Sequence, residues 1–257
     1  MNQTLNQNLL PSGTPSHQPH GDATSLVARV LANDKVNFDV KSGEVHASRR
    51  NGAGKKAPHE TALYFYRPDE GEICFDNVPH WRFTARRCHP LGHWHDSSTF
   101  HAGQFLNQGE NVALGLKSSR GFVTDLDVVS KRIEELAELY GLKVDPKAYI
   151  WQLSVGQQQR VEIIKALYRG AALLILDEPT AVLTPQEVND FFITLRHMAS
   201  DGHGLIFISH KLQEVMDFTD RVTVLRDGRN VATVETKHTN KEELARLMVG
   251  RELKLRS

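Results

Sequence analysis

The chain has 257 residues, 40% of them hydrophobic, which is enough to bury the core of one large or two small domains. Its 31 basic and 31 acidic residues balance, so the overall charge argues against nucleic acid or an anionic membrane surface as a general partner. The two cysteines, Cys74 and Cys88, are too few for a disulfide framework and suggest a reducing compartment. The longest apolar run, residues 171–176, is far shorter than the ~20 residues that a spanning helix requires, so we expect no transmembrane segment.

The amino-terminal residues differ in composition from the rest of the chain. Residues 1–24 are rich in Asn, Gln, Ser, Pro and His, and they lack the basic and apolar regions of a signal peptide. We expect a disordered tail here, followed by a single domain over residues 25–257. Within that domain, residues 36–40 (VNFDV) alternate like a strand, and residues 44–47 form a second extended run that leads into a glycine-rich loop.

A long amphipathic helix is predicted in the middle of the chain. Thr124 or Asp125 can cap its start, and Gly141 can end it. Its apolar side chains recur at helical spacing, at Val129, Ile133, Leu136 and Tyr140.

The second half of the chain alternates buried strands with helices. Residues 171–176 form an apolar strand that is followed by two acidic residues, and residues 205–208 form another that is followed by Ser209 and His210. Between them, residues 184–187 (TPQE) are a capping box that opens a helix.

A hairpin is predicted at Asp227-Gly228, between the apolar runs 222–225 and 231–234. Strands that alternate with helices indicate an α/β fold with a mostly parallel sheet core, to which the hairpin adds an antiparallel β part. In such folds ligands bind at the carboxyl ends of the strands.

Four motifs lie in order along the chain: NGAGK at 51–55, LSVGQQQR at 153–160, LLILDEPT at 173–180 and IFISH at 206–210. A glycine-rich loop that ends in lysine can hold phosphates with its backbone N–H groups and its ammonium. Together the motifs resemble the nucleotide-binding subunit of an ATP-binding-cassette (ABC) transporter, in particular the first cassette of the double-cassette importers for simple sugars or nucleosides. The resemblance implies a P-loop NTPase-like ABC cassette with a helical subdomain at about residues 110–170.

The resemblance also implies ATP and Mg²⁺ as cofactors, and it assigns a role to each motif residue. Asp177 would hold Mg²⁺ through water, Glu178 would orient and deprotonate the attacking water, and His210 would hydrogen-bond the γ-phosphate. Two further groups would contact ATP: Asn51, Gly52, Ala53, Gly54 and Lys55 on the chain's own side, and Ser154, Gly156 and Gln157 towards the ATP of an opposite cassette.

The partners implied by the resemblance are membrane permease subunits and a second ABC cassette in a dimer, with no nucleic acid. The protein would be cytoplasmic and peripheral on the inner face of the cell membrane, where it would bind and hydrolyse ATP to drive import. Because the chain ends near Leu253, where the first cassette of these importers ends, we expect the second cassette to be a separate chain.

Several residues depart from the family pattern. Arg49 occupies the position of the first P-loop glycine, and Lys56 occupies that of the hydroxyl that binds Mg²⁺. Residues 81–105 also lack the glutamine that the family carries between the P-loop and the LSVGQ signature. We therefore expect reduced autonomous hydrolysis; the alternative is a non-catalytic cassette remnant that binds or dimerises without turnover.

Two explanations compete for the divergent segment. Its histidines and cysteine are residue types that bind zinc, but the spacing of His80, Cys88, His89, His93, His95 and His101 matches no common zinc pattern. Alternatively, residues 87–108 are translated out of frame: back-translated with suitable synonymous codons and read one base later, they can give DAIRLGIGMIHQHFMLVNSLT, with the missing glutamine at Ser98. We favour the second hypothesis, in which small insertions or deletions rewrote the flanks of the P-loop.

Overall fold

The computed structural model describes the backbone of residues 23–27, 30–51, 70–71, 74–75, 78–79, 91–94, 105–114, 116 and 125–249. Side chains are described at residues 33–49, 70–71, 74, 105–114, 116 and 125–249. Among these residues, no helix is both long and apolar enough to cross a membrane.

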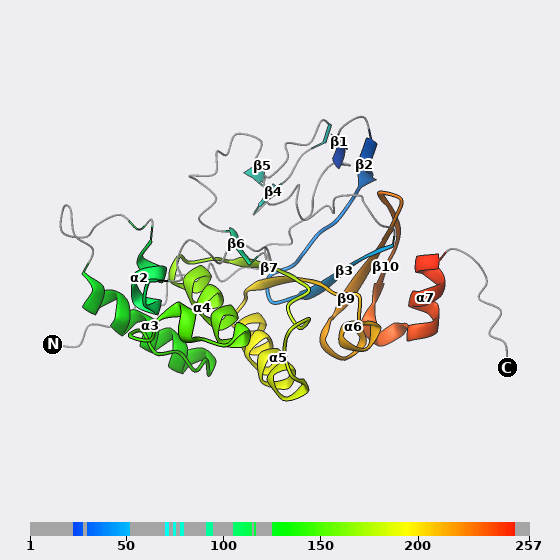
Figure 1. The fold of residues 1–257 in the computed structure, drawn as a ribbon. Coiled ribbons are helices and arrows are strands. Elements are labelled where there is room, and N and C mark those ends of the chain that lie inside the picture. Colours follow the sequence, from blue (N-terminus) through cyan, green and yellow to red (C-terminus); the bar gives the residue numbers. More distant parts are fainter. Residues whose placement is uncertain are drawn as a thin grey trace.

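A six-stranded sheet runs through the middle of the molecule in the order β10-β9-β3-β8-β7-β6 (Figure 1). All neighbouring pairs are parallel except β9 with β10, which is antiparallel. This confirms the predicted mostly parallel core with an antiparallel part. The strands are β3 (Val45–Asn51), β6 (Leu91–Trp94), β7 (Leu173–Asp177), β8 (Gly204–Ile208), β9 (Arg221–Arg226) and β10 (Arg229–Glu235).

The hairpin between β9 and β10 forms as predicted. Asp227 and Gly228 both have positive φ, at 52° and 78°, which is the backbone conformation that a two-residue type I′ turn requires. Glycine adopts this conformation without steric cost, and aspartate tolerates it better than most residues.

Two small antiparallel pairs lie outside the main sheet: β1 (Ala23–Val27) with β2 (Val30–Val36), and β4 (Cys74–Phe75) with β5 (Val78–Pro79). The strand predicted at residues 36–40 is wrong, because β2 ends at Val36. The alternating pattern has another cause: Val40 is buried, and the Phe38 ring lies 4.4 Å from the ring of His46 in β3. A loop packed on the sheet thus produces the same alternation as a strand.

Six α-helices and two short 3-10 helices complete the described part of the chain. The α-helices are α2 (Gln108–Ala113), α3 (Leu126–Tyr140), α4 (Val155–Tyr168), α5 (Pro185–Ser200), α6 (Leu212–Phe218) and α7 (Lys241–Val249), and the 3-10 helices are η3 (Ile150–Gln152) and η4 (Thr236–His238).

The two helices predicted from their caps are confirmed. Asp125 caps α3 by accepting the N–H groups of residues 127 and 128, and Gly141 ends it with φ of 64°. Thr184 and Glu187 form the predicted capping box at the start of α5. Both signals are local in the sequence, which is why they could be read without the fold.

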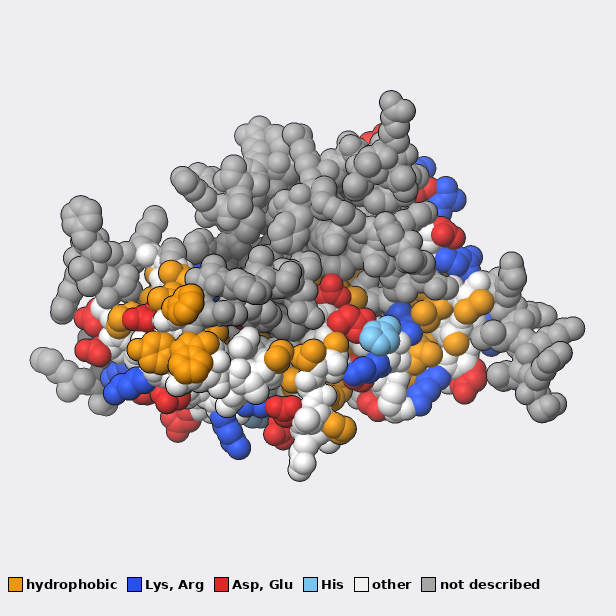
Figure 2. Space-filling view, in the orientation of Figure 1, with side chains coloured by type: hydrophobic (Ala, Val, Ile, Leu, Met, Phe, Trp, Pro, Cys, Tyr) orange, Lys and Arg blue, Asp and Glu red, His pale blue; other side chains and the backbone are white. Residues whose placement is uncertain are grey.

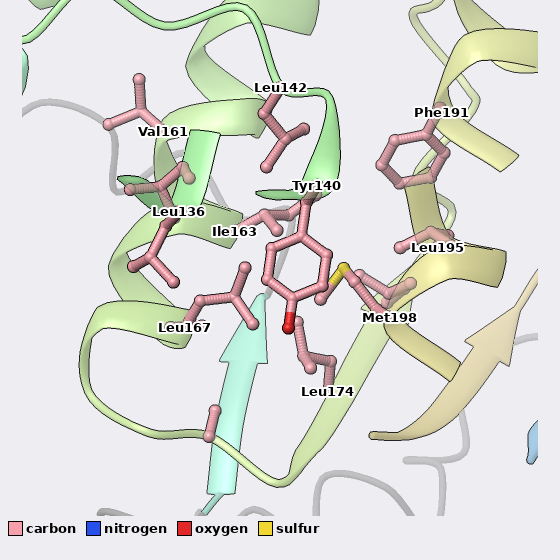
Figure 3. Packing of buried hydrophobic residues seen from close by; sticks show 14 of the residues in the cluster. Leu136, Tyr140, Leu142, Val161, Ile163, Leu167, Leu174, Phe191, Leu195 and Met198 are labelled. Carbon is pink, nitrogen blue, oxygen red and sulfur yellow. The ribbon is translucent and has the colours of Figure 1, made fainter. Parts of the chain in front are cut away.

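Helices α2, α3 and α4 gather at one end of the sheet, and α7 lies at the other (Figure 1). A single hydrophobic cluster joins α2, α3, α4 and α5 to the sheet: Leu136 and Tyr140 of α3, Leu174 of β7, and Leu195 and Met198 of α5 are all buried in it (Figure 3). The helical end is therefore held by the same core as the sheet. The domain boundaries stay a prediction: β1 includes Ala23 and Thr24, and residues 1–22 lie outside the described part.

Candidate functional site

Three strands bring their carboxyl ends to one edge of the sheet. β8 lies between β3 and β7, and both pairings are parallel. Asp177, the last residue of β7, is paired with Ile208, the last residue of β8. β3 ends at Asn51, so the chain enters its glycine loop at this same edge. Gly52, Ala53, Gly54 and Lys55 lie outside the described residues, as does the side chain of Asn51.

Glu178 and His210 meet at this edge. The carboxylate of Glu178 accepts the backbone N–H of His210 at 2.9 Å through Oε1, and its Oε2 lies 2.7 Å from Nδ1 of the His210 ring. Glu178 has a left-handed backbone with φ of 46°, which is uncommon for a residue other than glycine. Strained backbones of this kind concentrate at functional sites. The residues that follow β7 and β8 are thus joined through one carboxylate.

The same two loops are joined a second time through Glu214 of α6. Its Oε2 accepts hydrogen bonds from the hydroxyl of Thr180 at 2.6 Å and from that of Ser209 at 3.1 Å. Lys211 pairs with Oε1 at 2.9 Å and also donates to the Thr180 carbonyl at 3.1 Å. These bonds fix the backbone on both sides of the Glu178 and His210 contact.

The signature residues begin α4, as expected for residues that face an anion. Ser154 is the N-cap: its Oγ accepts the N–H of Gln157 at 3.3 Å, while the Gln157 side chain accepts the N–H of Ser154 at 2.8 Å. Both side chains are exposed. A hydroxyl that accepts a capping bond still has its own proton to donate, so Ser154 retains a donor for a ligand.

Gly156 has a packing role that the sequence alone did not reveal. It is buried, and a Cβ atom at this position would lie 2.9 Å from Cδ2 of Leu183 and 3.0 Å from Oε1 of Glu187. Gln159, one turn further on, is 1% exposed and donates to the carbonyl of Pro179 at 2.9 Å. The signature helix is therefore packed directly on the loop that follows Glu178.

Arg49 is the other residue whose role was missed. Only 6% exposed, it donates from Nη1 to the carbonyl of Ser209 at 2.9 Å and from Nη2 to the carbonyl of His210, and its Nε lies 2.8 Å from Sδ of Met248. Burial lowers the pKa of Arg49, while the charge of Glu178 acts in the opposite direction. Arginine at the position where the family has glycine therefore places a guanidinium against the loop that carries His210.

The zinc hypothesis falls almost entirely outside the described residues, because of its candidate ligands only His93 lies on a described backbone, in β6. Within the described ranges there is no group of three or more His, Cys, Asp or Glu side chains that could hold a metal ion. Lys56 is likewise outside them.

Comparison with known proteins gives a consistent result. The family described as "ABC transporter" matches residues 33–181. The chain is 42% identical over 235 residues to the nucleoside import ATP-binding protein NupA of Lactococcus lactis, covering 90% of this chain and 46% of that protein. It is 41% identical over 253 residues to the glucose import ATP-binding protein TsgD13 of Haloferax volcanii, covering 87% of this chain and 46% of that protein. The chain thus spans about half the length of these relatives.

Solved structures share the fold. A nucleotide-free ATP-binding cassette from an ABC transporter superposes with a TM-score of 0.76 at 19% identity, covering 92% of this chain and 96% of that one. The ADP conformation of another ABC transporter cassette gives a TM-score of 0.73 at 21% identity, covering 89% and 93%. With the family match and the relatives above, the chain belongs to the ABC transporter family, as an ATP-binding domain homologous to the sugar and nucleoside import ATP-binding proteins.

Proposed function

We propose that the chain is the ATP-binding subunit of an importer for a sugar or a nucleoside, and that it works with membrane permease subunits at the inner face of the cell membrane. The observation that carries the proposal is the meeting of Glu178 and His210 beside the end of β3, where the glycine loop begins. The relatives NupA and TsgD13 are named for nucleoside and glucose import, and these names supply the substrate classes.

The residues at the sheet edge suit the chemistry of ATP hydrolysis. Asp177 ends β7 half-buried and offers carboxylate oxygens, the ligand type that Mg²⁺ prefers. The ion, held there through water, would offset the charge of the phosphates. Glu178 would take the proton of the attacking water, and His210 would donate a hydrogen bond to a γ-phosphate oxygen. Residues 51–55 would hold the phosphates from the chain's own side.

The signature side of the chain would serve a second cassette. The start of α4 offers the Ser154 hydroxyl, the side chain of Gln157 and N–H groups at the positive end of the helix dipole. In a head-to-tail dimer these groups would face the γ-phosphate of ATP bound to the partner cassette. The packing of Gly156 and Gln159 against the loop after β7 would link this side to Glu178 of the same chain.

A second candidate, a cassette that binds or dimerises without turnover, is favoured by two buried residues. Gln108 ends the segment 87–108, is 3% exposed, and its Oε1 has no hydrogen-bond partner among the described residues. Arg49 buries a charge at the position of a glycine. A buried oxygen without a partner is costly, and a large charged side chain replaces a glycine at position 49; both observations support the hypothesis that the gene was rewritten by small insertions or deletions. The codons of residues 87–108, read one base later, test it: they must encode a glutamine near position 98.

Binding and turnover of ATP by the purified chain separate the candidates. We expect Mg²⁺-dependent binding of ATP with slow hydrolysis, and loss of that hydrolysis in Glu178→Gln. Glu138→Gln, on the exposed face of α3, is the matched control and should behave as the parent. Binding without any turnover favours the non-catalytic remnant. Absence of binding, or turnover that Glu178→Gln leaves intact, contradicts the proposed function.

A further inference from the structure

The end of β8 is held by an unusual contact. Ile208 is the last residue of β8, so the carbonyls of Ser209 and His210 lie beyond the strand pairing. Both are nevertheless hydrogen-bonded, and to the same guanidinium, that of Arg49 in β3. A guanidinium is planar, always charged, and presents its N–H donors as a rigid fork, so it fixes two neighbouring carbonyls relative to each other.

His210 is consequently held from both sides. Its carbonyl accepts from Arg49, while its N–H and its ring contact the two carboxylate oxygens of Glu178. Glu178 itself is anchored, because its N–H donates to the carbonyl of Ile208 at 2.8 Å. The ring of His210 is 72% exposed, so packing of the side chain contributes little to its position. Its orientation depends on these polar contacts.

The charges favour the same arrangement. The positive charge of Arg49 lies near the carboxylate of Glu178, and the two opposite charges attract each other. The carboxylate of Glu178 accepts the backbone N–H of His210, and hydrogen bonds to a carboxylate are stronger than those to a neutral acceptor. Arg49 thus acts on His210 twice, through the backbone carbonyl directly and through Glu178 indirectly.

We propose that Arg49 is a positioning residue that latches the 209–210 loop and keeps His210 paired with Glu178. The latch therefore sets the position from which His210 and Glu178 would meet a bound nucleotide. That consequence rests on the proposed function, since it requires Glu178 and His210 to act on ATP. The latch itself does not, and it can be measured without nucleotide.

Hydrogen exchange of the His210 backbone N–H in the full-length chain, without ATP, is the direct test. Arg49→Met keeps the aliphatic part of the side chain and removes its hydrogen-bond donors. The backbone N–H of His210, which donates to Glu178, should then exchange at least about tenfold faster than in the parent. This factor matches the strength of hydrogen bonds that involve charged groups. The ring signals of His210, identified by their loss in His210→Gln, should shift as well. Arg196→Met is the matched control: Arg196 also donates to a carbonyl, that of Phe218, but at a distant site.

Arg49→Lys keeps the charge and loses the fork, so its exchange rate should fall between those of the parent and Arg49→Met. It also carries the test if Arg49→Met does not fold. Parental exchange and parental ring signals in the folded Arg49 variants overturn the latch. Faster exchange with no ATP binding by any of the chains leaves the latch in place and contradicts the proposed function instead.

Discussion

We predict that acidification from pH 7 to pH 5 destabilises the fold through one buried imidazole. His46 lies in β3, the strand that leads to the glycine loop, and it is fully buried. Its Nδ1 lies 2.7 Å from the carbonyl of Asp39, which can only accept, and its Nε2 lies 2.8 Å from the hydroxyl of Thr223. The neutral ring satisfies both contacts, whereas a second proton at Nε2 would meet a hydroxyl that must then turn its own donor away.

The size of the effect follows from the pKa of His46. Burial, and then the charge of Arg221, lower this pKa from 6.5 to about 4. Between those values the unfolded chain binds a proton that the folded chain does not, so the free energy of unfolding rises with pH and is lost as the pH falls. At 1.36 kcal/mol per pKa unit, the loss between pH 7 and pH 5 is about 2 kcal/mol.

Urea unfolding at the two pH values measures this loss in the parent chain and in His46→Asn. Asparagine retains a donor and an acceptor but does not titrate. The free energy of unfolding of His46→Asn should therefore fall less between pH 7 and pH 5 than that of the parent, by about 2 kcal/mol. His203, whose pKa burial also lowers, is present in both chains and cancels. Glu44, whose pKa burial raises, acts with the opposite sign, and its Oε1 lies 3.8 Å from Nδ1 of His46, so the same comparison in Glu44→Gln chains removes its contribution. An equal loss of stability in the two chains would refute the reasoning.

Three further predictions concern packing, and unfolding free energies check all of them. Gln108→Leu should stabilise the chain by about 1 kcal/mol, because it removes a buried oxygen that has no partner among the described residues; destabilisation would contradict this. Gly156→Leu should cost about 1–3 kcal/mol, because the new leucine side chain would displace Leu183 and Glu187. Unchanged stability would show that the space around Gly156 can accept a side chain. Leu195→Ala should cost about 2–5 kcal/mol, because Leu195 is fully buried in the shared core (Figure 3), and a cost below 1 kcal/mol would be inconsistent with it.

Local signals made much of the fold predictable. The caps at Asp125 and Thr184 and the turn at Asp227-Gly228 each act within a few residues of chain, and all three are found where the sequence places them. The strand predicted at residues 36–40 does not form, because the alternation reflects packing of Phe38 on His46 and of Val40 on Ile175 and Ile206, and alternation alone cannot distinguish a strand from a packed loop.

The site was only partly predictable for a related reason. The motif order indicated that Glu178 and His210 end neighbouring strands, but their mutual contact depends on the left-handed backbone of Glu178. The bonds of Arg49 join residues about 160 positions apart, and the burial of Gly156 depends on the loop before α5. Such contacts arise from the tertiary arrangement and leave no local pattern.

Hydrophobic side chains also gather on the surface of the helical end, over α2, α3 and α4 (Figure 2). Two large hydrophobic side chains near these helices in the chain are exposed: Phe105, which precedes α2 and is 86% exposed, and Trp151 of η3, which is 62% exposed. Large exposed aromatic side chains are common where proteins contact partners.

The most direct test of the proposed function is ATP hydrolysis by an intact cassette, supplied separately, in the presence of this chain. The parent chain should stimulate that hydrolysis, and so should the surface control Glu138→Arg. Ser154→Asp keeps the helix cap but sets a negative charge against the γ-phosphate, and Ser154→Arg adds bulk, so neither variant should stimulate. No stimulation by the folded parent chain, or equal stimulation by the Ser154 variants, would contradict the account.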